Sequence, residues 1–210
     1  VNDVLVSAMA GALRHYLLEH DVDVTDLEFH AVIPVNLRPM ERALEMGNEF
    51  GLVFLKLPMG IPDPLVRLAA IKQHMDDIKN TPEAVIFFGL LGIFGTTPQQ
   101  IEEQVVNIFG TKATAVLTNV PGPQHPLYIA GNRITDSMFW VPQSGRLGIG
   151  ISILSYDGHV ALGIISDAGL VPDPRTITDR FAVEFAEMQK AVARLEARKR
   201  ARAENEFKAQ

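Results

Sequence analysis

The sequence predicts an α+β fold in which a mixed sheet packs with helices. Apolar residues recur at helical spacing near both ends of the chain, and they alternate with a period of two beyond residue 112. An Asp-Gly pair between two alternating runs adds a strong hairpin signal. With 210 residues, 47% of them hydrophobic, the chain can bury a substantial core. We expect one domain over residues 1–190, followed by a basic helical tail over residues 191–210.

The first predicted element is a helix that begins at Asn2. Asn2 can cap this helix, and Asp3 lies where the positive end of the helix dipole favours an acid. The apolar residues that follow recur at spacings of three and four, and they predict one buried stripe. They are Val4, Leu5, Ala8, Ala12, Leu13 and Tyr16.

Two strands and a second helix come next. Residues 29–35 and 50–57 are rich in β-branched and aromatic side chains, which favour strands. Pro34 indicates that the first of these is an edge strand or contains a break. An Asp-Pro pair, typical of a helix start, opens a predicted helix over residues 63–80.

The longest apolar run covers residues 84–95, with the sequence AVIFFGLLGIFG. It is too short to cross a bilayer, which takes about 20 residues. Two interpretations stay open, a buried core helix and a segment that faces lipid. A further helix is predicted over residues 97–110, because Thr97 and Gln100 have the spacing of a capping box.

The C-terminal half is predicted to be mostly strands, with a long helix from Asp173-Pro174 at the end. The predicted strands are 113–119, 127–130, 134–141, 147–155 and 159–166. In the fourth of these, large side chains alternate with Gly148, Gly150 and Ser152. Glycine inside a strand indicates that another group comes close. That group could be a packed helix or a ligand in a tunnel, and both alternatives stay open.

The chain contains no complete catalytic constellation of its own. It has no cysteine, which excludes disulfides, thiolate metal sites and a cysteine nucleophile. Its six histidines lack metal-site spacing, and the HExxH, Gly-x-Ser-x-Gly, Walker and dinucleotide patterns are all absent. A net charge of −6 argues against nucleic acid as a partner. We therefore expect no metal, no cofactor and no nucleic acid.

Six short segments, in order along the chain, resemble the C-terminal half of bacterial wax ester synthase/acyl-CoA:diacylglycerol acyltransferases (the WS/DGAT family). They are residues 2–5 (NDVL), 33–39 (IPVNLRP), 47–51 (GNEFG), 118–123 (TNVPGP), 127–131 (LYIAG) and 155–158 (SYDG). The resemblance implies a fold like that of the CoA-dependent acyltransferases, such as chloramphenicol acetyltransferase. In that fold two αβ lobes face each other across a substrate channel.

The resemblance also implies a function. The chain would be the C-terminal lobe of an enzyme that transfers a fatty acyl group from acyl-CoA to a long-chain alcohol or diacylglycerol. The family's catalytic motif, HHxxxDG, belongs to the N-terminal lobe and does not occur in this chain. An alcohol that attacks a thioester needs a general base. We therefore expect the chain to start near the middle of the family's sequence, to need that lobe as a partner, and to be inactive alone.

The resemblance suggests six substrate-binding residues, each with a structural alternative. They are Asn36, Arg38, Asn119, Gly122, Gly131 and Ser144. Arg38 could contact a CoA phosphate or form a salt bridge within the fold. Asn119 could hold a substrate carbonyl or pantetheine, or serve the turn that follows it. Gly131 could leave room for the alkyl acceptor. Ser144 could donate to the oxyanion or belong to a turn.

Two further features complete the expectations. Asn2 and Asp3 match a structural motif of the family. We expect them to cap the first helix and to form hydrogen bonds between the two lobes. Five basic residues gather in the tail. They could form an ordinary solvated helix end, where cations are favoured, or they could attract anionic lipid. They are Arg194, Arg198, Lys199, Arg200 and Arg202.

We expect a cytoplasmic protein, peripheral at the inner membrane or at lipid bodies. Two alternatives remain, a condensation-type lobe that uses carrier-protein thioesters, and a non-catalytic lipid-binding or scaffold domain.

Overall fold

The computed structural model describes residues 2–38, 42, 49–82, 85–86, 88–89, 112–142 and 147–208. The chain forms two compact units. The helical unit takes residues 1–27, 58–72 and 176–210, and the sheet unit takes residues 28–57 and 73–175. Because both units combine stretches that are distant in sequence, no single linker divides the chain. The predicted α+β class with a mixed sheet is confirmed.

The helical unit is built on α1 (Asn2–Glu19), with residues from α2 (Pro64–Lys79) and α5 (Pro174–Lys208). All residues from Leu5 to Leu13 in α1 are buried, so the predicted single stripe was too narrow. The reason is that alanine, serine and glycine occupy the other sides of α1, where neighbouring groups approach closely. Asn2 and Asp3 lie in the first turn of α1.

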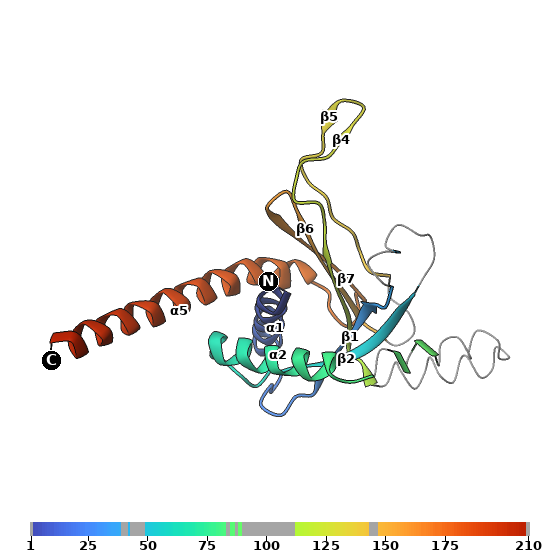
Figure 1. Cartoon of the computed structure of the whole chain (residues 1–210). Helices are drawn as coiled ribbons and strands as arrows, with labels where there is room; N and C mark the ends of the chain where they lie inside the picture. The colour runs from blue at the N-terminus through green and yellow to red at the C-terminus, as the bar shows by residue number, and fades with distance from the viewer. Residues whose placement is uncertain are drawn as a thin grey trace. The chain divides into compact units, whose positions relative to one another are not determined.

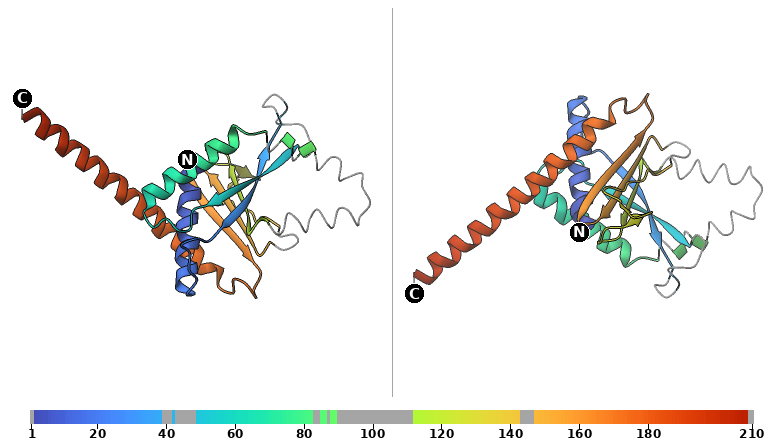
Figure 2. Two further views of the ribbon diagram at one scale, coloured as in Figure 1. Left: turned by 90° about the horizontal axis from the view of Figure 1, so that it is seen from below. Right: turned by 90° about the horizontal axis from the view of Figure 1, so that it is seen from above.

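The predicted starts of the two other helices are confirmed. The Asp63 carboxylate accepts hydrogen bonds from the amides of Leu65 (2.8 Å) and Val66 (3.0 Å), which caps α2. α5 begins at Pro174 and continues unbroken to Lys208. Figure 2 shows α5 extending well beyond α1 in both views. The expected boundary between residues 190 and 191 therefore falls within one continuous helix.

The sheet unit contains a five-stranded mixed sheet in the order β2-β1-β3-β6-β7 (Figure 1). Its strands are β1 (Phe29–Asn36), β2 (Phe50–Leu57), β3 (Ala115–Pro121), β6 (Ile149–Tyr156) and β7 (His159–Ser166). β1, β3 and β6 run parallel, and the outer strands β2 and β7 are antiparallel to their neighbours. The predicted hairpin is confirmed, with positive φ at Asp157 (46°) and Gly158 (79°) as a type I′ turn requires.

β1 is an interior strand, but its pairing with β3 is short. The β1–β3 ladder contains only two pairs among the described residues, Ala31 with Ala115 and Val32 with Val116. Pro34, which has no amide hydrogen, lies just past this ladder and still pairs in register with Leu52 of β2. Both interpretations of Pro34 are wrong, because β1 lies inside the sheet and runs from Phe29 to Asn36 without a break.

The two faces of the sheet differ in burial. One face carries side chains that are fully buried, among them Ala31, Leu55, Leu117 and Ile151. On the other face, which we call the outer face, most apolar side chains are half-buried or exposed, although Val32 is buried. They include Phe50, Leu52, Phe54, Val116, Val120 and Ile165.

The strands predicted over residues 127–130 and 134–141 differ from the structure. Residues 134–141 do not form a strand, and the carbonyls of Ile134 and Phe139 accept hydrogen bonds from the Tyr156 and Ser152 side chains instead of from a neighbouring strand. A small hairpin of β4 (Tyr128–Ile129) and β5 (Asn132–Arg133) precedes them and projects beyond the sheet (Figure 1).

The apolar run of residues 84–95 is only partly described. Val85, Ile86 and Phe88, three of its described residues, are exposed, so these side chains are not part of a buried core. The helix predicted over residues 97–110 lies outside the described residues.

Candidate functional site

Most of the predicted substrate-binding residues lie at one edge of the sheet. Because β1, β3 and β6 are parallel, their carboxyl ends share an edge, which we call the carboxyl edge. Asn36 ends β1, Asn119 lies near the end of β3, and Gly122 follows β3 directly. The side-chain carbonyl of Asn36 accepts a hydrogen bond from the Arg38 amide at 3.0 Å. Ser144 lies outside the described residues.

Gly122 has a structural role in the turn after β3. Its amide donates to the Ser155 carbonyl at 2.8 Å, and an added Cβ would overlap that oxygen and lie 3.2 Å from Leu154 Cδ1. The Asp157 amide donates to the Pro123 carbonyl at 2.9 Å beside it. The glycine therefore lets the turn of residues 121–123 pack against the end of β6.

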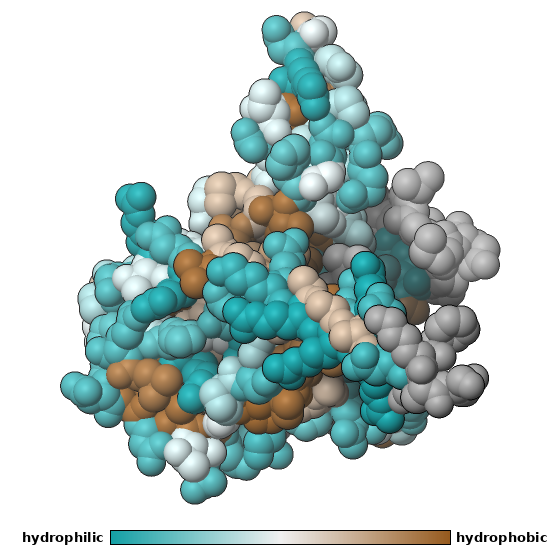
Figure 3. Space-filling view, turned by 90° about the vertical axis from the view of Figure 1, so that its left-hand side faces the viewer, coloured by the Kyte–Doolittle hydropathy of each residue, from teal (hydrophilic) through white to brown (hydrophobic). Residues whose placement is uncertain are grey.

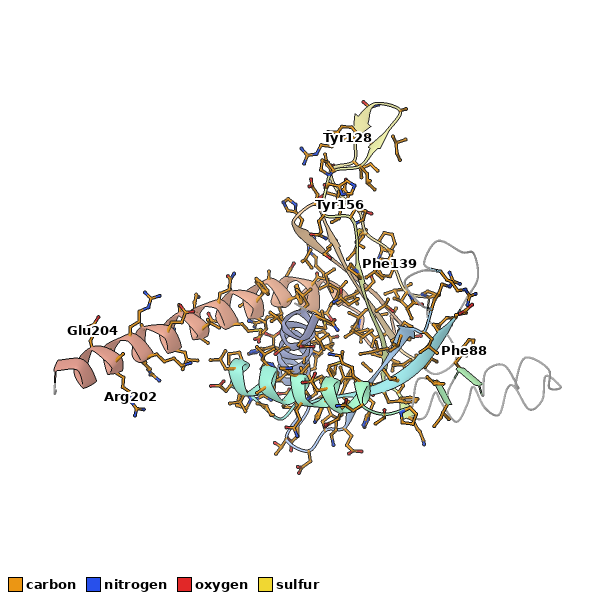
Figure 4. All side chains as sticks on the ribbon, in the orientation of Figure 1. Phe88, Tyr128, Phe139, Tyr156, Arg202 and Glu204 are labelled. Carbon is orange, nitrogen blue, oxygen red and sulfur yellow. The ribbon has the colours of Figure 1, made fainter. Side chains whose placement is uncertain are left out.

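Tyr156 joins two of the segments that carry the family resemblance. Its hydroxyl accepts a hydrogen bond from the Leu127 amide (2.8 Å) and donates to the Ile134 carbonyl (2.9 Å). An ion pair of 2.6 Å between Arg133 and Asp157 adds a second link. The base of the β4–β5 hairpin is thus tied to the β6–β7 turn. Figure 4 shows Tyr156 below the hairpin that carries Tyr128.

The tip of this hairpin is open. Ala130 (φ 50°) and Gly131 (φ 78°) form its turn, and nothing lies within 4 Å of a Cβ added at Gly131. The turn itself therefore explains the glycine, and an acceptor pocket at Gly131 stays a prediction. Leu127 (39%), Tyr128 (62%) and Ile129 (67%) are exposed. The projecting hairpin at the top of Figure 3 is otherwise mostly hydrophilic.

The small residues of β6 and β7 receive other parts of the chain. A Cβ added at Gly163 would lie 2.7 Å from the Phe139 carbonyl and 3.4 Å from Trp140 Cδ1. The buried Ser152 hydroxyl donates to that same Phe139 carbonyl. At Gly148, an added Cβ would lie 2.5 Å from Leu170 Cδ1. At Gly148 and Gly163, therefore, neither a packed helix nor a ligand tunnel is correct, because two loops fill the space.

A cavity of about 480 Å³ lies at the opposite edge of the sheet, at the amino ends of β1 and β3. It is lined by Glu28, His30, Phe54, Lys112 and Thr114. Lys56 bonds the Glu28 carboxylate at 2.9 Å, and this hydrogen bond holds the pKa of Glu28 below its usual value. None of the predicted site residues that the structure describes lines this cavity.

The helical unit contains a buried ionic cluster that the sequence analysis missed. Arg67 of α2 is 1% exposed and forms an ion pair with the buried Glu184 of α5. Glu184 also lies 3.0 Å from His15 Nε2. Burial lowers the pKa of Arg67, and Glu184 acts in the opposite direction. A Cβ at Gly11 would overlap Glu184 and lie 2.5 Å from Arg67 Nη2.

A glycine in the middle of a helix was the one available signal for this cluster. Such a glycine costs roughly 1 kcal/mol relative to alanine, so its presence indicates a close neighbour. The sequence could not name that neighbour, because Arg67 and Glu184 are 117 residues apart.

Residues 46–189 match the family described as the WS/DGAT C-terminal domain. The chain belongs to this family. The match covers more than half of the chain and includes the resemblant segments from residue 47 onward. The predicted family and fold class are thereby confirmed.

Curated relatives agree with this membership. A Mycobacterium tuberculosis H37Rv protein, provisionally named a diacylglycerol O-acyltransferase, is 32% identical over 90% of this chain and 38% of its own length. Another from the same strain, tgs2, carries the same kind of provisional name and is 27% identical over 91% of this chain and 43% of its own. The chain therefore spans about two fifths of the curated relatives it matches.

Two solved structures share the fold. The wax ester synthase/diacylglycerol acyltransferase from Marinobacter aquaeolei VT8 superposes with a TM-score of 0.65 and 21% identity, over 91% of this chain and 44% of that one. A nonribosomal peptide synthetase, FmoA3, gives a TM-score of 0.51 and 18% identity, over 88% of this chain and 19% of that one. The fold is that of the CoA-dependent acyltransferases.

Proposed function

We propose that this domain is the C-terminal lobe of an O-acyltransferase that joins fatty acyl groups to a long-chain alcohol or diacylglycerol. The acceptor oxygen bonds to the thioester carbonyl carbon, the carbon–sulfur bond breaks, and the hydroxyl proton passes to a general base. The products are CoA and a wax ester or triacylglycerol. Membership in the WS/DGAT C-terminal domain family is the observation that carries this proposal.

The two lobes divide the chemistry in this proposal. The chain has no HHxxxDG motif, so the base comes from an N-terminal lobe. The half-exposed apolar outer face, with Phe54 and Val116 among its residues, is suited to line one side of an acyl channel. The β4–β5 hairpin, with Tyr128 and Ile129 exposed, offers a contact for the other lobe.

The carboxyl edge would hold the polar parts of the acyl donor. Asn119 at the end of β3 would hold a carbonyl or the pantetheine arm, and Asn36 would position Arg38, whose guanidinium suits a CoA phosphate. Ser144 would donate a hydrogen bond to the oxyanion that forms at the thioester carbon. Gly122 would shape the turn beside these groups, and Gly131 the acceptor's path. Acyl-CoA is then a substrate, and we propose no cofactor.

The experiment compares the chain alone with the chain joined to the N-terminal lobe of a relative that carries HHxxxDG. Both are incubated with radiolabelled palmitoyl-CoA and either hexadecanol or dioleoylglycerol, and ester formation is measured. We expect ester from the joined protein and none from the chain alone. A matched joined protein, with the second motif histidine replaced by alanine, should be inactive. Turnover by the chain alone, or none by the joined protein, would contradict the proposal.

One observation favours a second candidate, a condensation-type lobe that takes thioesters from a carrier protein. The FmoA3 structure, a nonribosomal peptide synthetase, shares this fold. Supplying the same acyl group on CoA and on a carrier protein separates the two candidates. A kcat/KM that is higher with the carrier protein would favour the second.

We also propose where the enzyme works, in the cytoplasm at the inner membrane or at lipid bodies. Within the part of the chain that the structure describes, no helix is both long and apolar enough to cross a membrane. In this proposal, attachment at such a surface uses exposed side chains of the domain.

A further inference from the structure

The last part of α5 is an exposed, positively charged helix. Every residue from Val192 to Asn205 is exposed. Residues 190–208 contain seven lysines and arginines against three glutamates, a net charge of +4. Since the whole chain has a net charge of −6, the remaining residues carry −10. The positive charge is therefore concentrated in one helical segment of an acidic chain.

The basic side chains of this segment share one side of the helix. At about 100° per residue, Arg194, Arg198, Lys199 and Arg202 fall within an arc of about 140°. We call this arc the basic face. Between Val192 and Asn205 the two glutamates, Glu196 and Glu204, lie outside it. Glu196 is 3.9 Å from Arg200, which also lies outside. Figure 4 shows Arg202 and Glu204 pointing to opposite sides of α5.

Two apolar side chains accompany the basic face. Leu195 lies within the arc and Val192 at its border, and both are 43% exposed. They continue the stripe that contains the buried Met188 (4% exposed), one turn earlier on the same side of α5. Exposed cations beside exposed apolar side chains are the pattern of helices that lie in a membrane interface. Such cations meet lipid phosphates, while the apolar side chains enter the region below them.

We propose that the basic face of α5 docks the domain on an anionic phospholipid bilayer. The inference rests on the proposed function, because an enzyme that esterifies long-chain alcohols or diacylglycerol takes its acceptor from a lipid phase. The charge complementarity is direct, since the leaflet is negative and the segment carries +4. A nucleic acid would match the arginines but would leave Leu195 and Val192 in water.

Docking also accounts for a helix that extends so far into solvent. An isolated helix of fewer than about 12–15 residues is marginal in water, even with good helix formers. Residues 192–205 have such a length and lie exposed. A surface that binds one side of the segment would stabilise it.

The test is co-sedimentation of the chain with phosphatidylcholine vesicles, with and without phosphatidylglycerol, at low and high salt. We expect binding only to vesicles that contain phosphatidylglycerol, and loss of binding at high salt because ions screen the attraction. A variant with Arg194→Gln, Arg198→Gln and Arg202→Gln should bind about a hundredfold more weakly, since each basic residue contributes about fivefold.

A matched control removes the same charge elsewhere. Lys56→Gln, Lys79→Gln and Lys112→Gln alter three exposed cations outside residues 190–208, and binding should stay within about twofold of the unaltered chain. Circular dichroism would show that both variants keep their helix content. The proposal is overturned by equal binding of the two triple variants, by equal binding to pure phosphatidylcholine, or by equally tight binding to a DNA duplex. Because the assay needs no turnover, it is independent of the acyl-transfer experiment.

Discussion

Replacing Arg67 with methionine should strongly destabilise the helical unit. The Arg67 guanidinium donates to the carbonyls of Ser7 (3.2 Å), Ile61 (3.1 Å) and Pro62 (3.2 Å), and it forms an ion pair with Glu184. Methionine would fill much of the same volume but leave these acceptors without their donor. Removing one partner of a buried ion pair costs about 3–5 kcal/mol.

That cost is large against the whole stability of a domain, which is about 5–15 kcal/mol. For a chain of this size each kcal/mol lowers Tm by about 2–4 °C, so Arg67→Met should lower Tm by about 10 °C. The assay is thermal and urea unfolding followed by circular dichroism. The matched control is Lys79→Met, which breaks an exposed pair with Asp76 (3.5 Å) and should change Tm by less than about 2 °C.

A second variant separates the ion pair from simple loss of packing. If the charge on Glu184 is the cause, then Glu184→Leu added to Arg67→Met should restore part of the lost stability, because the buried carboxylate that lost its arginine is then removed as well. An Arg67→Met chain as stable as the Lys79→Met chain would refute the reasoning.

The sheet unit offers three smaller predictions. Gly122→Ala should cost about 1–3 kcal/mol in urea unfolding, since its Cβ would overlap a carbonyl of β6; an unchanged midpoint would count against the packing described. Tyr156→Phe should speed hydrogen exchange of the Leu127 amide, which loses its acceptor, and unaltered exchange would mean that the hydroxyl is not needed. Lys56→Met should raise the pKa of Glu28 in an NMR titration, because the hydrogen bond that lowers it is gone. Because the pKa of Glu28 is lowered in the folded state, its pairing with Lys56 stabilises the fold fully above the unfolded-state pKa of 4.5. This contribution is lost as the pH falls from that value through the lower folded-state pKa, so the stability difference between the two chains should shrink over that interval.

Local signals in the sequence predicted most of the elements. β1, β2 and the β6–β7 hairpin lie within a residue or two of the expected ranges, because period-two alternation and an Asp-Gly turn depend on neighbouring residues. The start of α2 followed from Asp63, whose carboxylate caps it as expected. The strand predicted over residues 134–141 is wrong. The stretch is bounded by turn residues, as a strand would be, but the side chains of Ser152 and Tyr156 donate hydrogen bonds to the carbonyls of Phe139 and Ile134.

The candidate site was predictable in part. The resemblant segments located Asn36, Asn119 and Gly122, and the parallel strands bring all three to the carboxyl edge. Their chemistry toward a substrate stays a prediction. The bond from Tyr156 to the β4–β5 hairpin could not be anticipated, because a tyrosine in a turn motif has no signal for a partner 29 residues away.

By itself, the sequence determined the α+β class, the helix starts, the tight turns and the family, since each depends on residues within a few positions of one another or on short motifs. Only the tertiary structure decided which distant groups meet. It placed β3 between β1 and β6, set Glu184 against Arg67 beside Gly11, and brought residues 139–140 over Gly163. The physical reason is that burial, packing and the pairing of buried charges depend on the whole chain at once, whereas periodicity and turn chemistry are local.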